Sequence, residues 1–448
     1  MPRIPLFSKT MTISSPSSDI PSDTTLTGIV SCLSGYDPEA LPVRDAQTII
    51  RRFVQPIDAV EKVAIRSALD RVLAADIVSP INVPSHDNSA MDGYALRGAD
   101  LGEGDRAFAI VATSYAGRAY DGKVDSGECV RIMTGAVMPE GCDTVIPQEF
   151  VRQAGESGII VPAGAVKPGD NRRLKGEDLA IGSPALRRGR ILRPADLGLL
   201  ASLGIAEVPV RRRLRVAFFS TGDELRSVGE TLEEGCVYDS NRYTLYGMLT
   251  RLGCEIVDMG VVKDDPASLE AAFRAACASA DAVVTSGGVS VGTADYTKKM
   301  MEDLGEVLFW KIGMRPGRPM AFGRIASNGN SAYLFGLPGN PVAVMVSFYF
   351  FARQALLHMM GAEPAGLPPA MKAVAAEAIR KRPGRTEFQR GILCAREDGV
   401  QEVRLTGAQG SGILRSMSEA NCMVVLEHER GPVQLGETVD VILFDGLA

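Results

Sequence analysis

A glycine-rich turn carries the residue types best suited to chemistry in this chain. It follows the apolar run 281–285 and contains Gly287, Gly288, Ser290 and Gly292, with Asp295 at its exit. A strand that passes through such a turn into a helix presents backbone N–H groups to an anion. Because a carboxylate beside a bound phosphate commonly holds a metal ion, Asp295 is a candidate metal ligand. The alternative is a tight strand-to-helix turn without a ligand, since glycine-rich loops are common.

The pattern around this turn predicts the scaffold that positions it. From Leu214 onward, apolar runs alternate with helical patterns, which is typical of a parallel sheet covered by helices on both faces. Ligands bind such sheets at the carboxyl ends of the strands. Five polar loops follow the predicted strands, so one edge should gather a set of charged side chains: Asp223, Glu224, Asp264, Asp295, Lys311, Arg315 and Arg318.

These charges suit metal-assisted phosphoanhydride chemistry. Asp264 and Asp295 are hard oxygen donors, and Mg²⁺ prefers one or two carboxylates together with substrate phosphates. The cations of the loop 311–319 form a second half that could bind another anion or neutralise charge that develops in a transition state. No Ser–His–Asp or Cys–His arrangement is apparent, so covalent catalysis has no obvious nucleophile.

The texture of the sequence changes several times along the 448 residues, which are too many for one core. We predict an α/β multidomain protein with a parallel-sheet domain, a β-rich inserted domain, a helical and extended linking domain and a small C-terminal β-barrel. The predicted boundaries are a flexible N-terminal arm at 1–40, a linking domain at 41–84 and 183–212, the inserted domain at 85–182, the α/β domain at 213–363 and the barrel at 364–448.

Composition argues against several classes of protein. A net charge of −6 leaves no basic excess for binding nucleic acid. Eight cysteines without a CxxC pair, together with only three histidines, suit a reducing cytoplasm better than a zinc site or a disulfide framework. The N-terminus lacks the apolar core of a secretory signal. The apolar segment 342–360 contains Arg353, so we predict a buried helix that starts at Pro341 and no membrane span.

Several motifs together resemble one enzyme family. They are, in chain order, Asp87-Asn-Ser-Ala-Met-Asp-Gly-Tyr-Ala95, Arg131-Ile-Met-Thr-Gly135, Ser220-Thr-Gly-Asp-Glu-Leu225, Ser286-Gly-Gly-Val-Ser-Val-Gly292 and Leu337-Pro-Gly-Asn-Pro341. This series resembles the molybdopterin molybdenumtransferases, the molybdenum insertase family that includes MoeA and the gephyrin E domain. The resemblance runs from about residue 43 to 445, in motif order.

The resemblance implies a reaction and an assembly. Adenylylated molybdopterin and molybdate, with Mg²⁺, would give molybdenum cofactor and AMP. The subunit would have four parts and form a homodimer whose inserted domain leans over the partner's α/β site. Matching positions imply metal carboxylates at Asp264 and Asp295, and molybdate contacts at Arg318, Pro319, Arg385 and Ser411. They also imply substrate or catalytic positions at Asp92, Thr134, Asp178, Asp223, Glu224, Lys311, Arg315 and Arg390.

This chain departs from the family pattern at two places. Members often have Lys-Pro-Gly-Lys-Pro where this chain has Arg315-Pro-Gly-Arg-Pro319. Arginine keeps the charge but changes the hydrogen-bond geometry, so contacts with the oxyanion should differ in detail. Many members have serine where this chain has Ala343, which removes one hydroxyl donor.

Two other functions compete with this interpretation. A molybdopterin adenylyltransferase has a similar α/β domain and glycine motif, but it does not need the inserted domain or the barrel. A gephyrin-like scaffold without activity would have no reason to keep the acidic and basic loops. The expected partners are small-molecule substrates and a second subunit, with a molybdopterin adenylyltransferase or apo-molybdoenzymes as further candidates.

Overall fold

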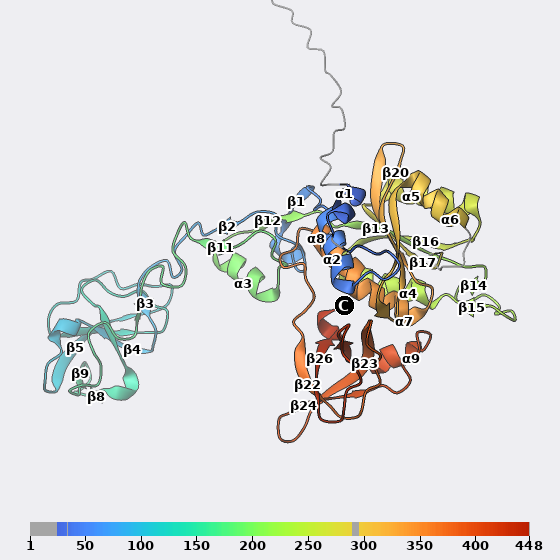
Figure 1. Ribbon diagram of the computed structural model, residues 1–448. Helices are drawn as coiled ribbons and strands as arrows, with labels where there is room; N and C mark the ends of the chain where they lie inside the picture. The colour runs from blue at the N-terminus through green and yellow to red at the C-terminus, as the bar shows by residue number, and fades with distance from the viewer. Residues whose placement is uncertain (1–24, 34, 289–294, 448) are drawn as a thin grey trace, which may run out of the picture. The chain divides into compact units, whose positions relative to one another are not determined.

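The computed structural model describes residues 25–33, 35–288 and 295–447 (Figure 1). The chain forms two compact units. The first contains Met1–Asp58 and Arg212–Ala448, and the second contains Ala59–Arg211. Each unit has cores of its own, and each is described here by itself.

A six-stranded sheet forms the centre of the first unit, in the order β16-β13-β17-β21-β20-β18. Its strands are β13 (Arg215–Thr221), β16 (Glu255–Val262), β17 (Ala282–Ser286), β18 (Gly305–Lys311), β20 (Pro319–Ser327) and β21 (Asn330–Leu337). Strands β16, β13, β17 and β21 are parallel, whereas β20 is antiparallel to both of its neighbours. The sheet is therefore mixed, which corrects the predicted parallel sheet; the prediction had no strand at 319–327.

The reversal at β20 does not disturb the predicted edge. Two successive antiparallel pairings restore the original direction, so β18 runs the same way as β21. Lys311, at the end of β18, therefore lies at the edge where the parallel strands end. Polar loops far apart in the sequence meet along this edge, as the alternating pattern predicted.

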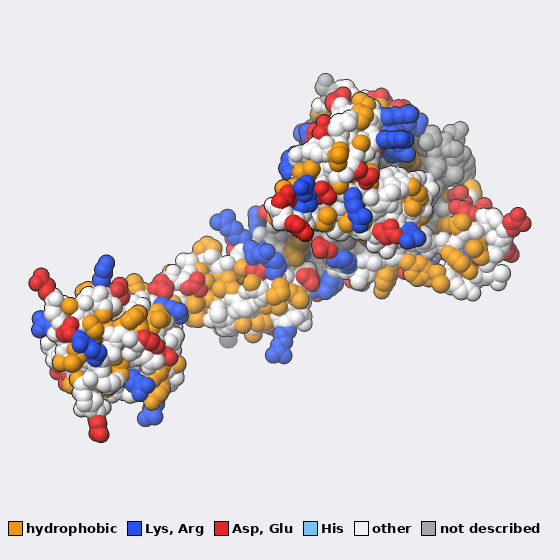
Figure 2. Space-filling model, turned by 90° about the horizontal axis from the view of Figure 1, so that it is seen from below, with side chains coloured by type: hydrophobic (Ala, Val, Ile, Leu, Met, Phe, Trp, Pro, Cys, Tyr) orange, Lys and Arg blue, Asp and Glu red, His pale blue; other side chains and the backbone are white. Residues whose placement is uncertain are grey.

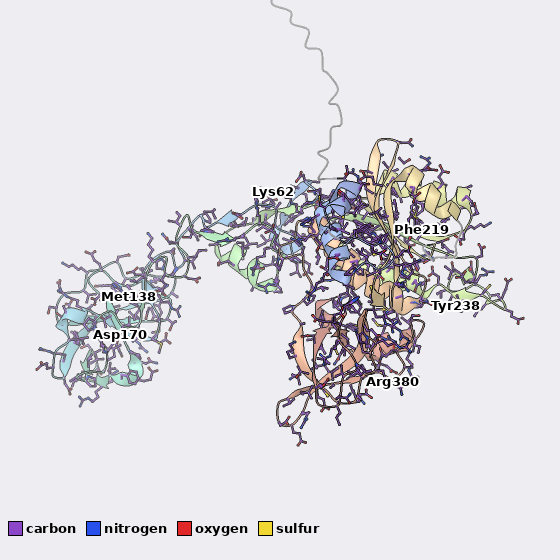
Figure 3. The ribbon with its side chains drawn as sticks, in the orientation of Figure 1. Lys62, Met138, Asp170, Phe219, Tyr238 and Arg380 are labelled. Carbon is purple, nitrogen blue, oxygen red and sulfur yellow. The ribbon has the colours of Figure 1, made fainter. Side chains whose placement is uncertain are left out.

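Helices cover both faces of the sheet (Figure 1). Phe219, Phe273 and Met301 belong to one core beneath the helices on one face; Figure 3 labels Phe219 within the sheet. Asp239 and Asp265 cap the first two helices by accepting backbone N–H groups. The helices are α4 (Ser240–Arg251), α5 (Pro266–Ser279), α6 (Asp295–Leu304), α7 (Pro341–Ser347) and α8 (Arg353–Met359), with a π-helical turn at Phe348–Ala352 between the last two.

The helix Pro341–Met359 is long and apolar enough to cross a bilayer, but it is a core helix here. In its most apolar window, 78% of the residues are buried inside the protein. Phe348, Phe350 and Phe351 have no exposed surface. The prediction of a buried helix that begins at Pro341 is confirmed.

The C-terminal part of the first unit is a small closed barrel. Its strands are β22 (Met371–Ala375), β23 (Thr386–Ala395), β24 (Gln401–Leu405), β25 (Cys422–Leu426) and β26 (Thr438–Leu443), and pairing of β23 with both β24 and β25 closes it. Its core contains Val403, Val424 and Val441, and helix α9 (Leu414–Glu419) lies beside β23. A sixth strand, β19 (Met314–Arg315), comes from the α/β domain and pairs in parallel with β23.

The second unit contains two structural regions. One is built from the antiparallel pairs β1 (Val60–Ala64) with β12 (Glu207–Arg211) and β2 (Ile77–Val78) with β11 (Pro184–Leu186), together with α3 (Pro194–Ser202). The other is a six-stranded sheet in the order β7-β4-β6-β5-β9-β8. Its strands, and the pair that accompanies them, are β4 (Gly93–Leu96), β5 (Arg106–Ser114), β6 (Glu128–Ile132), β7 (Thr144–Pro147), β8 (Arg152–Gln153), β9 (Gly158–Val161), β3 (Asn88–Ser89) and β10 (Arg172–Arg173).

Residues 25–33 and 35–40 belong to the predicted flexible arm, but in the structure they are ordered. Helix α1 (Leu26–Ser31) buries Leu26 and Ile29 against the α/β domain and the following helix, α2 (Val43–Phe53). Thr25 caps α1 through its hydroxyl. The apolar residues that order this segment are few, so composition alone indicated an arm. Residues 1–24 of the predicted arm lie outside the described part of the chain.

Candidate active site

The carboxyl edge of the central sheet brings three glycine-containing loops together. Ser220 and Ser286 are register partners, and Ser286 in turn pairs with Leu337. The loops that follow these residues therefore start side by side. Asp223 and Glu224 follow β13 and are exposed, and their backbone carbonyls accept bonds from the small ladder formed by β14 (Leu225–Arg226) and β15 (Val237–Tyr238). Figure 3 labels Tyr238 in this ladder.

The glycine turn after β17 requires its glycines. Gly287 and Gly288 have φ values of 92° and 70°, in the left-handed region that favours glycine. A Cβ atom on Gly287 would lie 2.4 Å from the carbonyl oxygen of Thr221. The N–H of Gly287 donates to the carbonyl of Leu337 at 3.1 Å. Ser290 and Gly292, the other predicted residues of the turn, lie outside the described residues.

Asn241 joins two of the loops and was missed from the sequence. Its Nδ2 donates to Ser286 Oγ and to the carbonyl of Gly339, both at 2.7 Å. Its neighbour Asp239 accepts from Ser220 Oγ at 3.0 Å while it caps α4. These bonds attach the carboxyl ends of β13 and β17 to the start of α4. The signal available in the sequence was the run Asp239-Ser-Asn241, in which Asp239 caps α4 and Asn241 lies in its first turn.

Of the two predicted metal carboxylates, Asp264 lies at this edge of the sheet. Asp264 follows β16, and Thr221 Oγ1 lies 3.4 Å from its Oδ1. Asp295 begins α6, but its side chain lies outside the described part. Within residues 25–33, 35–288 and 295–447 no group of three or more His, Cys, Asp and Glu side chains could hold a metal by itself. The Asp264 carboxylate is a hard oxygen donor, a type of ligand that suits Mg²⁺.

The cationic half lies on the loop between β18 and β20. The ammonium of Lys311 is paired with the Glu39 carboxylate, and Arg318 Nη2 donates to the Glu39 carbonyl at 3.4 Å. The backbone N–H of Ile312 donates to the carbonyl of Arg318 at 2.7 Å, which folds the loop back on itself. Pro319, the next residue, begins β20 and pairs with Lys311. Lys311, Arg318 and Pro319 are thus held at one sheet edge.

Arg315 connects this loop to the barrel. As part of β19, it is the register partner of Glu387, and Thr386 N donates to the Gly313 carbonyl at 2.9 Å. A cavity of about 490 Å³ opens beside it. Its lining includes Arg315, Arg380, Gln389 and the turn 407–410; Figure 3 labels Arg380 in the barrel.

Arg385 is oriented by a buried acid that sequence reasoning missed. Its Nε and Nη2 donate to Glu387 Oε1 at 2.9 and 2.8 Å. Gln389 Nε2 donates to Glu387 Oε2 at 3.0 Å. The Glu387 side chain is 5% exposed and that of Arg385 is 33% exposed. A buried carboxylate therefore orients a guanidinium that remains partly exposed. Part of the signal was present, because Glu387 and Gln389 are two apart on β23 and therefore share a face.

Arg390 shapes a loop from inside the barrel. It has no exposed surface, and its guanidinium donates to Ser416 Oγ and to the carbonyls of Ala408, Gln409 and Gly410. Burial, and then the positive charge of Arg315, lower the pKa of Arg390 to about 10. Arg390 was predicted as a substrate or catalytic position; in the structure its donors hold the backbone of the turn that precedes Ser411.

Ser411 and the Arg315–Pro319 turn both meet the start of α7. The N–H of Val342 donates to the carbonyl of Ser411 at 3.0 Å. A Cβ on Gly317 would lie 2.6 Å from Ser347 Oγ and 3.4 Å from the carbonyl of Ala343. Ala343 is 2% exposed, so the small residue at this departure from the family pattern lies in a tightly packed place.

Asp92, Thr134 and Asp178 belong to the second unit. Asp92 Oδ1 accepts from the Thr134 N–H at 2.6 Å and from its hydroxyl at 2.7 Å. These bonds, the backbone one first, lower the pKa of Asp92 and keep it ionised. Asp178 is exposed, and its N–H donates to the carbonyl of Val83 at 3.1 Å. The motif residues Asp92 and Thr134 are therefore one hydrogen-bonded pair.

Four buried cysteines are poor nucleophiles. Burial raises the pKa of the Cys129, Cys142, Cys254 and Cys422 thiols to about 12. Such thiols remain protonated and inert.

Figure 2 shows Lys and Arg interspersed with Asp and Glu on the face it presents.

Comparison with known proteins identifies one family over most of the chain between residues 41 and 444. Residues 41–204 match the model of the MoeA N-terminal region (domain I and II), residues 217–358 a probable molybdopterin binding domain, and residues 372–444 the MoeA C-terminal region (domain IV). MoeA regions on both sides of the α/β domain favour the molybdenumtransferase prediction over the adenylyltransferase alternative.

Individual relatives agree with the family models. The molybdopterin molybdenumtransferase of Haemophilus influenzae is 46% identical over 387 residues, which cover 86% of this chain and 94% of that protein. The corresponding Nostoc enzyme is 36% identical over 88% of this chain and 90% of its own. A crystal structure of a Pyrococcus horikoshii moeA protein is similar with a TM-score of 0.77 and 30% identity, covering 90% of this chain and all of that one. The chain therefore belongs to the MoeA family and is a molybdopterin molybdenumtransferase of molybdenum cofactor biosynthesis.

Proposed function

We propose that the enzyme takes adenylylated molybdopterin as its molybdopterin substrate and releases AMP as molybdenum is inserted. The observation that carries this proposal is the loop 311–319. It starts at the carboxyl edge of the α/β sheet and continues into the barrel sheet through β19. A phosphoanhydride and an oxyanion repel each other, so a site for both needs fixed cations between them. This loop carries Lys311, Arg315 and Arg318 along that path.

The glycine turn and its neighbours suit the phosphate side of the substrate. Gly287 and Gly288 bring the backbone close to a ligand without a Cβ in the way. Asp264, with Thr221 beside it, would hold Mg²⁺ together with substrate phosphate oxygens, and Asp295 is the second carboxylate expected for it. When bound, Mg²⁺ would neutralise phosphate charge. Asp223 and Glu224 sit on the adjoining exposed loop, where they can face a substrate.

The barrel side suits the oxyanion. Arg385, fixed by Glu387, offers a planar and permanently charged fork. Ser411 lies in a glycine-flanked loop that Arg390 holds from behind. With Arg318 and Pro319 at the end of the cationic loop, these groups form the proposed molybdate contacts. The Arg315 and Arg318 forks replace the lysines common in the family, so bidentate contacts become available.

The assembly is proposed from the family resemblance. In a homodimer, Asp92, Thr134 and Asp178 of the inserted domain would complete the site of the partner subunit. The ionised Asp92, fixed by two bonds from Thr134, would then serve as an acceptor for a substrate N–H or O–H group. A cytoplasmic location suits eight free cysteines. A molybdopterin adenylyltransferase or an apo-molybdoenzyme could exchange substrate or product directly.

One experiment tests the core of this proposal. The protein is incubated with adenylylated molybdopterin, molybdate and Mg²⁺, and AMP is followed over time. AMP release that requires both molybdate and Mg²⁺ is expected. Release that proceeds equally with unadenylylated molybdopterin and free ATP would instead indicate that the enzyme activates the pterin itself.

A further inference from the structure

Residues 25–40 precede the part of the chain that matches the family, which begins at residue 41. The described residues among them, 25–33 and 35–40, form an ordered segment together with Leu41, which we call the N-terminal strap. Leu26, Ile29 and Leu41 are at most 4% exposed. The N–H of Leu26 donates to the Glu306 carboxylate at 3.3 Å, near the start of β18. The strap is therefore packed on the α/β domain.

The strap follows the backbone at the start of the cationic loop. Lys311 N donates to the Pro38 carbonyl at 2.7 Å, and Leu41 N donates to the Lys311 carbonyl at 3.2 Å. Gly313 N then donates to the Leu41 carbonyl at 2.8 Å. These bonds fix the strap on both sides of Glu39, so the backbone of Glu39 is held beside the cationic loop.

Glu39 is placed on two cations of the candidate site. Its carboxylate pairs with the ammonium of Lys311, and its carbonyl accepts from Arg318. The Asp37 carboxylate accepts the Glu39 N–H at 2.9 Å, which shapes the turn. The Glu39 side chain is 65% exposed and that of Lys311 is 28% exposed. A pair this open to water is weakly held and can be displaced by another anion.

We propose that Glu39 is a specificity-determining residue: its carboxylate competes with the anionic oxygens of the substrates for Lys311. This inference rests on the proposed role of Lys311. An incoming oxyanion must displace the carboxylate or approach a second negative charge, and either raises the concentration needed for binding. Ligands that offer Lys311 more charge than a carboxylate, such as a dianion, are favoured over monoanions.

The test is the variant Glu39→Gln, which keeps the side-chain length and the backbone carbonyl that Arg318 uses. Equilibrium dialysis with molybdate and, in a separate arm, with AMP measures binding without turnover. Removing an exposed carboxylate should lower the dissociation constant of at least one anion about two- to fivefold. The arm that responds tells whether molybdate or phosphate oxygens meet Lys311. Glu363→Gln, which removes an exposed carboxylate elsewhere on the same unit, should change neither constant.

The competing outcomes are distinct. Unchanged or weaker binding of both anions by Glu39→Gln would overturn the proposal, and weaker binding would show that Glu39 positions Lys311. In a Lys311→Met background, Glu39→Gln should no longer lower either dissociation constant. A lower constant in the double variant Glu39→Gln/Lys311→Met than in Lys311→Met alone would also overturn the proposal. Failure of the wild-type protein to release AMP would refute the proposed function alone, because the dialysis arms need no turnover.

Discussion

Replacing Arg385 with alanine should raise the molybdate requirement without weakening the binding of adenylylated molybdopterin. Its guanidinium has two donors fixed on Glu387, while 33% of the side chain remains exposed to solvent. A hydrogen bond to a charged group contributes about 1.5–3 kcal/mol. At about 1.4 kcal/mol per factor of ten, the loss corresponds to a ten- to hundredfold increase in the half-saturating molybdate concentration.

The same substitution should also destabilise the barrel. It leaves the Glu387 carboxylate, 5% exposed, with Gln389 as its remaining side-chain hydrogen-bond donor among the described residues. An unsatisfied buried acceptor costs about 1–3 kcal/mol. The double variant Arg385→Ala/Glu387→Gln should recover part of this free energy of unfolding but none of the molybdate affinity. That separation distinguishes a binding role from a structural one.

AMP release as a function of molybdate, together with urea unfolding, checks both effects. Arg404→Ala, which removes an exposed barrel cation, is the matched control and should leave both measurements unchanged. Lost binding of adenylylated molybdopterin with unaltered molybdate dependence would refute the reasoning. The barrel would then belong to the pterin or nucleotide pocket, and the oxyanion would bind elsewhere.

Three further predictions concern the metal, the assembly and a proton. Asp295→Asn should weaken Mg²⁺-dependent turnover and change the free energy of unfolding by less than about 0.5 kcal/mol; an unchanged Mg²⁺ requirement would remove Asp295 from the site. Mixing Asp92→Ala subunits with Asp295→Asn subunits should restore part of the activity through heterodimers, whereas no rescue under subunit exchange would favour a site within one chain. Thr134→Ala should raise the pKa of Asp92 only part of the way to 3.8, because the backbone donor, the larger cause, remains. Because the pKa of Asp92 is lower in the folded protein, these bonds stabilise the fold at pH values above the pKa of the unfolded carboxyl. That stabilisation is lost as the pH falls through the pKa of the folded carboxyl, and NMR titration of the carboxyl measures this pKa.

The sequence predicted that the polar loops gather at one edge of the sheet, because this arrangement follows from a local pattern. A strand, a polar loop and a helix repeat, and parallel strands end together. The missed strand β20 was also detectable. It is joined to β21 by Asn328-Gly329, both with positive φ, and Asn-Gly is a strong hairpin signal. The preceding arginine- and proline-rich loop obscured it.

Other features depend on contacts that no local pattern records. The strap is ordered by Leu26, Ile29 and Leu41, whose burial depends on surfaces nearly 300 residues away in the sequence, such as Glu306. Arg390 looks like any strand arginine, and only the folded barrel shows that the turn 408–410 surrounds it. The role of Glu39 is likewise invisible until Lys311 is placed beside it.

The pairing of β19 with β23 makes the cationic loop a mechanical link within the first unit. A rotation of the barrel away from the sheet would break the Thr386–Gly313 hydrogen bond and displace Arg315. The position of Arg315 therefore depends on the orientation of the barrel relative to the sheet. By thermodynamic reciprocity, a ligand that binds these cations must restrain the barrel, and a barrel held in place must bind that ligand more tightly. A partner that binds the outer strands of the barrel would thus change the affinity of these cations for an anion without contacting them.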